Sequence, residues 1–245
     1  MCISVKKINP TVQTTKKNEV MIKQLFKKYH EKWAIEKFNF FLSKLTPAKG
    51  ETILDLGGGD GSYMDRFSSS LKDYKIVISD IDEASLQRAR AKGYYTTILD
   101  ASSNKLPYKD KEIDIIFCNS VIEHITIPKD QLWSARSYSS GFAKDAFEIQ
   151  KKFASEIIRS AKKYYVQTPH RHFPIEAHSW FPFISYLNRK TQLTVLKQLN
   201  KFWVKKTQPD WNLLTEKDMK ILFPDAEIIV RKKLGMKKEI IAIKR

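Results

Sequence analysis

Residues 52–61 read TILDLGGGDG, and this stretch decides how the chain folds. Its first half is a short apolar run typical of a buried strand, and it leads directly into glycines at positions 57, 58, 59 and 61. The whole chain has only eight glycines in 245 residues. Glycine concentrated in this way indicates a backbone that turns tightly or approaches a ligand closely. We therefore predict a strand, a glycine turn and a helix, with a ligand at the turn.

The segments around this stretch alternate between strand and helix patterns. Helices are predicted from the glycine turn to about residue 71, over Glu83–Lys92 and over about Ala143–Lys162. Further strands are predicted at Lys75–Asp80, Tyr95–Leu99, Ile113–Asn119 and Tyr164–Thr168, and the last twenty residues read as two strands around a turn at Gly235. The pattern predicts an α/β fold: an open, doubly wound, mostly parallel sheet with helices on both faces and a C-terminal antiparallel hairpin.

The remaining segments suggest how the chain is divided. Residues 1–50 are predicted to be a tail followed by a helix from about Asn18 to Leu45, and residues 51–245 to be the main domain. Within that domain, about 169–214 is aromatic and basic without strand periodicity, so we interpret it as an acceptor-site insertion. A helix over Thr215–Phe223 begins with Thr215 as its N-cap.

Composition limits the class of protein. At 42% hydrophobic residues the chain can bury a core, and it has no apolar run long enough to span a membrane and no apolar leader at its start. Two cysteines, Cys2 and Cys118, are too few for a disulfide framework. These features predict a cytoplasmic protein.

The formal net charge of +17 raises the question of a polyanionic partner. Lys greatly outnumbers Arg among the 44 basic residues, although Arg is the better side chain for bidentate phosphate and base contacts. We therefore interpret most of the charge as solvated surface. The aromatic and Lys-rich stretch 179–211 suggests peripheral contact with an anionic membrane as an alternative to packing in the core.

Acidic residues stand at the ends of consecutive predicted strands. Asp55 lies in the first, Asp80 ends the second and Asp100 follows the third. In sheets of this kind, a carboxylate at the end of the second strand accepts hydrogen bonds from a ribose. The glycine turn lacks the Lys of a phosphate-binding loop and departs from the dinucleotide fingerprint at Ser62. The ligand predicted here is a nucleoside whose recognition does not depend on a phosphate.

In combination, ILDLGGGDG, ISDID and LDASSNKLPYKDKEIDIIFCNSVIEHI resemble the class I S-adenosylmethionine-dependent methyltransferases, in particular the methyltransferase type 11-like branch with an "LEH" motif after the fourth strand. The resemblance implies a Rossmann-like sheet of seven strands with the last one antiparallel, and S-adenosyl-L-methionine as the cofactor. It also implies a set of cofactor-binding residues: Asp55, Gly57, Gly59, Gly61, Asp80, Ile81, Asp100, Ala101 and Asn119. Asp80 would hold the ribose, Asp100 and Ala101 the adenine, and Asn119 would lie near the methionine end.

A second group of polar residues follows the fourth and fifth strands. His124 closes NSVIEH, and His170, His172, Glu176 and His178 lie in TPHRHFPIEAH. We predict His124 or His178 as a catalytic base, with Glu176 orienting it, because imidazole titrates in the useful range. A loop braced by hydrogen bonds is the alternative. Divalent-metal binding by His170, His172, Glu176 and His178 is a further alternative, since imidazole and carboxylate suit such ions. Their spacing fits no standard zinc site, so no metal site is predicted.

The TPHRHFPIEAH loop resembles a loop of methyltransferases associated with surface-glycan and lipid-linked sugar pathways. The resemblance implies O-methylation of a sugar, glycan or other small polar acceptor. A quinone or lipid-head methyltransferase and an RNA methyltransferase are the alternatives. The fourth strand lacks the N/D-P-P-Y/F motif of nucleic-acid methyltransferases, which argues against a nucleic-acid partner. The acceptor and the oligomeric state stay open.

Overall fold

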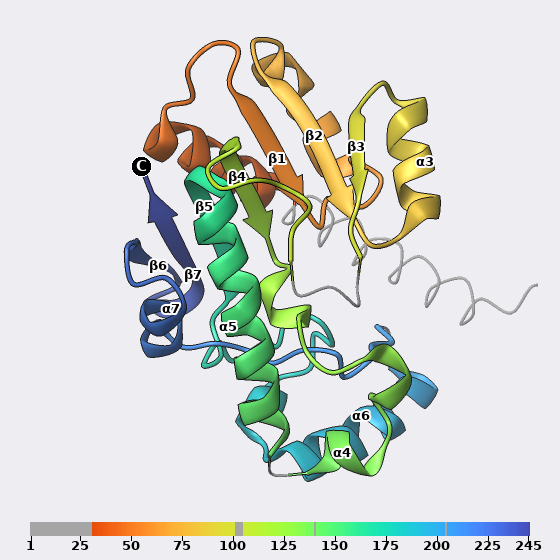
Figure 1. Ribbon diagram of the computed structural model, residues 1–245. Coiled ribbons are helices and arrows are strands. Elements are labelled where there is room, and N and C mark those ends of the chain that lie inside the picture. The colour runs from red at the N-terminus through yellow and green to blue at the C-terminus, as the bar shows by residue number, and fades with distance from the viewer. Residues whose placement is uncertain (1–30, 101–104, 140, 204) are drawn as a thin grey trace, which may run out of the picture. The chain divides into compact units, whose positions relative to one another are not determined.

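The computed structural model describes residues 31–100, 105–139, 141–203 and 205–245 (Figure 1). The chain divides into two compact units, Met1–Thr46 and Pro47–Arg245. In the first unit the described residues form a helix over 31–45, which is the second half of the helix predicted from Asn18 to Leu45. The first half of that prediction lies outside the described residues.

The second unit is built on a seven-stranded sheet in the order β3-β2-β1-β4-β5-β7-β6. The strands are β1 (Thr52–Leu56), β2 (Lys75–Asp80), β3 (Tyr95–Ile98), β4 (Ile113–Asn119), β5 (Ala161–Pro169), β6 (Glu227–Lys233) and β7 (Met236–Lys244). The first five are mutually parallel, and β7 runs antiparallel between β5 and β6. The predicted fold class is confirmed, including the C-terminal hairpin.

Strand β1 lies at the centre of the winding. It pairs with β2 on one side, where Leu56 is opposite Ser79, and with β4 on the other, where Asp55 is opposite Phe117. The chain therefore reverses its direction of winding at β1, and the carboxyl ends of β1 and β4 flank a switch point. Open α/β sheets bind their ligands in the crevice at such a point.

The helices are α2 (Ser62–Asp65), α3 (Glu83–Ala91), α4 (Ala135–Tyr138), α5 (Phe142–Ser160), α6 (Arg189–Phe202) and α7 (Glu216–Leu222). The helix predicted from the glycine turn to residue 71 is much shorter than expected, since α2 has four residues and a separate 3-10 turn covers Ser68–Leu71. Three consecutive serines occupy this turn, and serine competes with helix formation through its own hydrogen bonds.

The segment expected to be an insertion contains α6, which packs its apolar face inward. Leu196 and Leu199 are buried in a cluster with Ile184, Trp211 and Leu213, separate from the main core cluster of the sheet. Figure 1 shows α6 and α4 together beside one end of α5, and Arg189 at the start of α6 donates to the Ser137 carbonyl. In the described part of the chain, no helix is both long and apolar enough to cross a membrane.

Candidate functional site

The glycine turn holds its shape through contacts that a side chain would break. Gly57 has a φ of 78°, and its N–H donates to the Ser79 carbonyl at 2.7 Å. A Cβ at Gly57 would lie 2.6 Å from Cγ2 of Val121, and one at Gly58 would lie 2.5 Å from Oδ2 of Asp55. The turn is therefore held between β2, the loop after β4 and the side chain of Asp55, and a Cβ at position 57 or 58 would force one of these neighbours to move.

Asp55 lies behind the turn and is shielded from solvent. Its side chain is buried, and Oδ2 has no hydrogen-bond partner among the described residues. Burial, followed by the nearby charge of Asp80, raises the pKa of Asp55 to about 7. This placement fits a residue that supports the turn from behind.

Asp80 faces the turn from the end of β2. Its Oδ2 accepts the Gly59 N–H at 2.9 Å, and its Oδ1 accepts the Asp82 N–H at 3.0 Å. Ile81, the next residue, is 48% exposed. The carboxylate is thus held in place at the rim of the sheet beside an accessible apolar side chain, which is the arrangement expected for a ribose and an adenine.

The other predicted cofactor residues end neighbouring strands at the same edge. Asp100 is exposed and follows β3, and Asn119 is the last residue of β4. Ala101 lies outside the described residues. The structure brings the glycines, Asp80, Asp100 and Asn119 to the carboxyl edge of one parallel sheet, as their positions in the sequence predicted.

Sequence analysis missed the loop before β4 that borders this edge. The Tyr108 hydroxyl is 2.9 Å from the Ser79 hydroxyl in β2. Arg159 in α5 donates to the carbonyls of Tyr108 and Leu106, and Glu156 accepts the Leu106 N–H. Leu106 and Tyr108 lie in a stretch that carries the family resemblance, but their contacts with Arg159 and Glu156 leave no sequence signal, because the loop and α5 are far apart along the chain.

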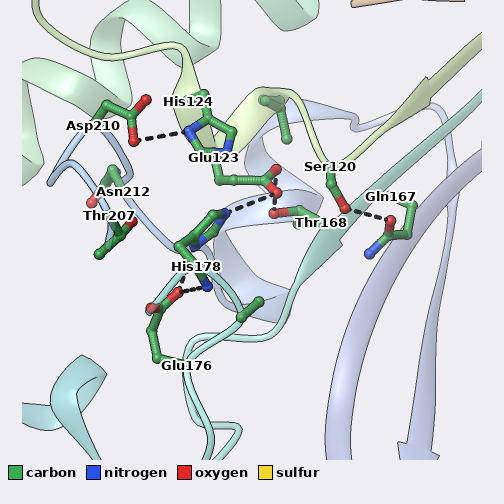
Figure 2. Close-up of polar contacts among 12 residues, drawn as sticks. Ser120, Glu123, His124, Gln167, Thr168, Glu176, His178, Thr207, Asp210 and Asn212 are labelled. Atoms are coloured by element: carbon green, nitrogen blue, oxygen red, sulfur yellow. Dashed lines mark hydrogen bonds and ion pairs between the residues drawn. The ribbon is translucent and has the colours of Figure 1, made fainter. Parts of the chain in front are cut away.

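A second polar cluster lies in the loops after β4 and β5 (Figure 2). Glu123 and His124 are in the 3-10 turn Ile122–His124, and His178 is in the loop after β5. The rings of His124 and His178 meet edge to face, with centroids 4.6 Å apart. The two histidines predicted as alternative bases are therefore direct neighbours.

Glu176 fixes the ring of His178. Its Oε1 lies 2.5 Å from Nδ1 of His178 and accepts the backbone N–H of the same residue at 2.7 Å. Its Oε2 accepts from the N–H and the hydroxyl of Ser179. Burial opposes ionisation, but the hydrogen bond and charge of His178 outweigh it and lower the pKa of Glu176. Glu176 therefore fixes the orientation of the His178 ring, and its part in catalysis stays a prediction.

Asp210 lies beside the ring of His124, as Glu176 lies beside that of His178. The sequence did not point to this residue. Its Oδ1 lies 3.2 Å from Nδ1 of His124. Burial lowers the proton affinity of the imidazole, but hydrogen bonding to Asp210 and the charge of Glu123 prevail, so the pKa of His124 is raised. Asp210 stands in the aromatic segment without a recognisable spacing to His124, so no sequence signal pairs them.

Glu123 lies close to both histidines, and its side chain is fully buried. Its Oε2 accepts from the Thr168 hydroxyl at 3.0 Å, while Oε1 has no hydrogen-bond partner among the described residues and lies 3.8 Å from Nε2 of His178. The hydrogen bond from Thr168 therefore accounts for one of the two Glu123 oxygens only.

The cluster opens on a pocket of about 400 Å³. Its lining combines the two histidines and Asp210 with three lysines and two polar residues: Lys129, Lys205, Lys206, Thr207 and Gln208. His170 and His172 belong to a separate pair, in which Nδ1 of His170 accepts the His172 N–H at 3.0 Å. Of the histidines in TPHRHFPIEAH, His178 alone joins the cluster.

Comparison with known proteins connects the first of these sites to a family. Residues 53–137 match the model of a methyltransferase domain. An uncharacterized methyltransferase of Mycobacterium tuberculosis is 34% identical over 82 residues, which is 34% of this chain and 32% of that protein. One from Mycobacteroides abscessus is 34% identical over 83 residues, covering 33% of this chain and 32% of its own. The chain thus matches about a third of the length of these relatives.

Among solved structures, that of a SAM dependent methyltransferase from Archaeoglobus fulgidus has the same fold. The TM-score is 0.51 at 12% sequence identity, and the match covers 87% of this chain and 94% of that one. The structural match covers most of this chain, whereas the match to the family model ends at residue 137. The second polar cluster, apart from Glu123 and His124, lies beyond the residues that the family model matches.

Proposed function

We propose that this chain, whose residues 53–137 match the model of a methyltransferase domain, transfers a methyl group from S-adenosyl-L-methionine to a hydroxyl of a sugar, glycan or other small polar acceptor. One observation carries the proposal: Asp80 is held by the Gly59 N–H at the carboxyl edge of the sheet, beside the switch point. This is where a nucleoside-bearing cofactor would bind.

The glycine turn and the acidic residues beside it are chemically suited to this cofactor. S-adenosylmethionine carries a sulfonium cation and no phosphate, so carboxylates and backbone dipoles suit it better than a lysine does. Asp80 would accept from the ribose hydroxyls, Ile81 and Asp100 would contact the adenine, and Gly57 with Asn119 would border the methionine end. Asp55 would support the turn from behind without touching the cofactor.

The methyl transfer is an in-line displacement. A lone pair of the acceptor oxygen forms the new O–C bond while the C–S bond breaks, and its electron pair stays on sulfur as a neutral thioether. The hydroxyl proton passes to the imidazole of His178 or His124. Glu176 holds the ring of His178 by Nδ1, and Asp210 lies 3.2 Å from Nδ1 of His124, so Nε2 of either ring would receive the proton. Alignment of the three reacting atoms would supply much of the acceleration.

The likeness of the TPHRHFPIEAH loop to glycan-pathway methyltransferases supports a sugar or glycan acceptor, and the polar lining of the neighbouring pocket is consistent with one. A quinone or lipid-head acceptor would use the aromatic side chains of the same segment. An RNA acceptor has the net charge of +17 in its favour and no further observation.

The cofactor assignment is tested with Asp80→Ala. We expect this variant to bind S-adenosylmethionine at least about tenfold more weakly by calorimetry, because the charged acceptor for the ribose is lost. Asp82→Ala is the matched control: it removes a carboxylate two residues away that caps α3, and it should leave the affinity unchanged. Equal affinity in wild type and Asp80→Ala would refute the ribose assignment.

The base assignment is tested with His124→Ala and His178→Ala against a panel of sugar and glycan acceptors and a labelled methyl donor. Loss of a general base lowers turnover by about 100-fold or more. Binding of S-adenosylmethionine should persist in both variants. His172→Ala removes an exposed histidine outside the cluster and should keep full turnover. Full activity in both cluster variants would show that neither imidazole acts as the base.

A further inference from the structure

Glu123, His124 and His178 have the arrangement of a metal site. One ligand atom from each side chain lies within 4.8 Å of those of the other two. The first two residues follow β4 and the third lies in the loop after β5, so the set is assembled by the pairing of these strands and has no local spacing motif. The three residues therefore do not form a zinc pattern that can be recognised in the sequence.

The orientation of the two imidazoles supports this reading. Nδ1 of His178 is bonded to Glu176, and Nδ1 of His124 lies beside Asp210 (Figure 2). Nδ1 of each ring thus faces a carboxylate, although among the described residues only Nδ1 of His178 has hydrogen-bond geometry to it. Nε2 is then the nitrogen of each ring that is available to a ligand. Metal-bound histidines almost always have such a carboxylate or carbonyl partner on the other nitrogen, because it fixes the tautomer and raises ligand basicity.

Glu123 supplies an independent observation. Its side chain is fully buried, yet Oε1 has no hydrogen-bond partner among the described residues. Nε2 of His178 is 3.8 Å from that oxygen, which is too far for a hydrogen bond and leaves space for a shared cation. Thr168 holds the other oxygen and thereby aims Oε1 at the histidines. A buried acceptor without a donor is costly, and a bound cation would remove the cost.

We infer that Glu123, His124 and His178 bind a divalent transition-metal ion of the Zn²⁺ type. Two imidazoles and one carboxylate suit Zn²⁺, whereas Mg²⁺ and Ca²⁺ prefer oxygen ligands alone. Three protein ligands leave at least one coordination position open. His124 and His178 also line the pocket, so a water or a hydroxyl in the pocket would have access to an ion held by them.

The inference deepens the proposed function at the same site and rests on it only for its effect on turnover. The general-base role describes the metal-free protein, because a coordinated Nε2 has no lone pair for a proton. In the metal-loaded protein, the cation would acidify an acceptor hydroxyl bound beside it, and that hydroxyl would give its proton to solvent water. Binding of the ion itself does not depend on methyl transfer.

The test begins with the full chain stripped of metal by a chelator. Calorimetry with Zn²⁺ should show one tight site, and Co²⁺ as a spectroscopic substitute should give visible bands typical of nitrogen and oxygen ligation. We expect affinity to fall by about 100-fold or more in His124→Ala and His178→Ala, and by about tenfold or more in Glu123→Gln, which keeps the size of the buried side chain. Mg²⁺ in excess should not compete.

Two further variants keep the result interpretable. His172→Ala, at the neighbouring histidine pair, should bind Zn²⁺ as wild type does. Asp210→Asn should weaken Zn²⁺ binding by about tenfold, since it removes the charge behind His124 without removing a ligand. Circular dichroism of the metal-free variants checks that each is folded.

The inference is overturned if the folded wild type shows no tight Zn²⁺ site, if His172→Ala abolishes it, or if the cluster variants bind Zn²⁺ as wild type does. Its failure is distinguishable from failure of the proposed function. Asp80→Ala should lose S-adenosylmethionine binding and keep Zn²⁺ binding, and His178→Ala should do the reverse.

Discussion

At the scale of single residues, the unusual group is Asp55, a buried carboxyl beside another carboxylate. Its pKa of about 7 lies above the ordinary value of 3.8, because burial and the charge of Asp80 disfavour the ionised form. A raised pKa in the folded state contributes stability that is complete below about pH 4 and is lost as the pH rises through 7. At alkaline pH the folded protein therefore carries an unfavourable buried charge.

Asp55→Asn should remove this pH dependence. Three pKa units correspond to at most about 4 kcal/mol, so we expect the variant to gain up to that much over wild type at about pH 8.5 and to gain little at about pH 5. Urea unfolding at both pH values measures the difference. Asp114→Asn serves as a control of opposite sign, because hydrogen bonding to Lys162 and Thr52 outweighs burial and lowers the pKa of Asp114. Parallel pH profiles for wild type and Asp55→Asn would contradict this account.

At the scale of elements, the two turns that flank β1 depend on glycine for different reasons. Gly57 and Gly50 both have φ in the left-handed region, at 78° and 86°. A Cβ at Gly50 would meet nothing within 4 Å, whereas one at Gly57 would collide with the Val121 side chain. The two positions thus share the backbone cost of a substitution and differ in the steric cost.

Gly57→Ala and Gly50→Ala form a matched pair for this reason. We expect Gly50→Ala to lose about 1 kcal/mol of unfolding free energy, and Gly57→Ala to lose about 1–3 kcal/mol more because the turn must move away from Val121. Chemical denaturation gives both values, and calorimetry should show weaker S-adenosylmethionine binding for Gly57→Ala alone. Equal losses for the two variants would mean that the turn yields without cost.

At the scale of the whole molecule, two features bear on membrane contact: the net charge of +17 and the exposed aromatic side chains of the segment after β5. Phe183 is 62% exposed and Tyr186 is 53% exposed. The apolar face of α6, by contrast, is buried, so the interfacial alternative for this segment rests on its loops. Peripheral contact with an anionic membrane stays a prediction.

Vesicle sedimentation tests that contact. We expect the protein to bind vesicles rich in anionic lipid at low salt and to be released at high salt, because the attraction is screened. Neutral vesicles should bind little under either condition. Phe183→Ser with Tyr186→Ser should reduce the binding to anionic vesicles if these rings enter the interface. Binding that is indifferent to salt and lipid charge would rule the contact out.

Much of this architecture can be read from local patterns. The strands β1, β2 and β4 have the predicted bounds, because apolar runs that end in Asp, Gly or Asn are strong strand signals. The N-cap predicted at Thr215 is present, with a capping box to Asp218. The short α2 was not foreseen, since the apolar periodicity up to Leu71 says nothing of the turn that three serines impose.

The sequence by itself determined the sheet, the glycine turn and the row of acidic residues, because each depends on neighbours a few positions apart. Only the tertiary structure decided which polar residues meet. β4 pairs with β5 so that Asn119 lies opposite Gln167, and this register brings the loop of His124 to the loop of His178. Only the structure shows that Asp210 lies beside His124 and that one Glu123 oxygen has no hydrogen-bond partner among the described residues. Contacts between segments far apart along the chain produce no periodic pattern in the sequence.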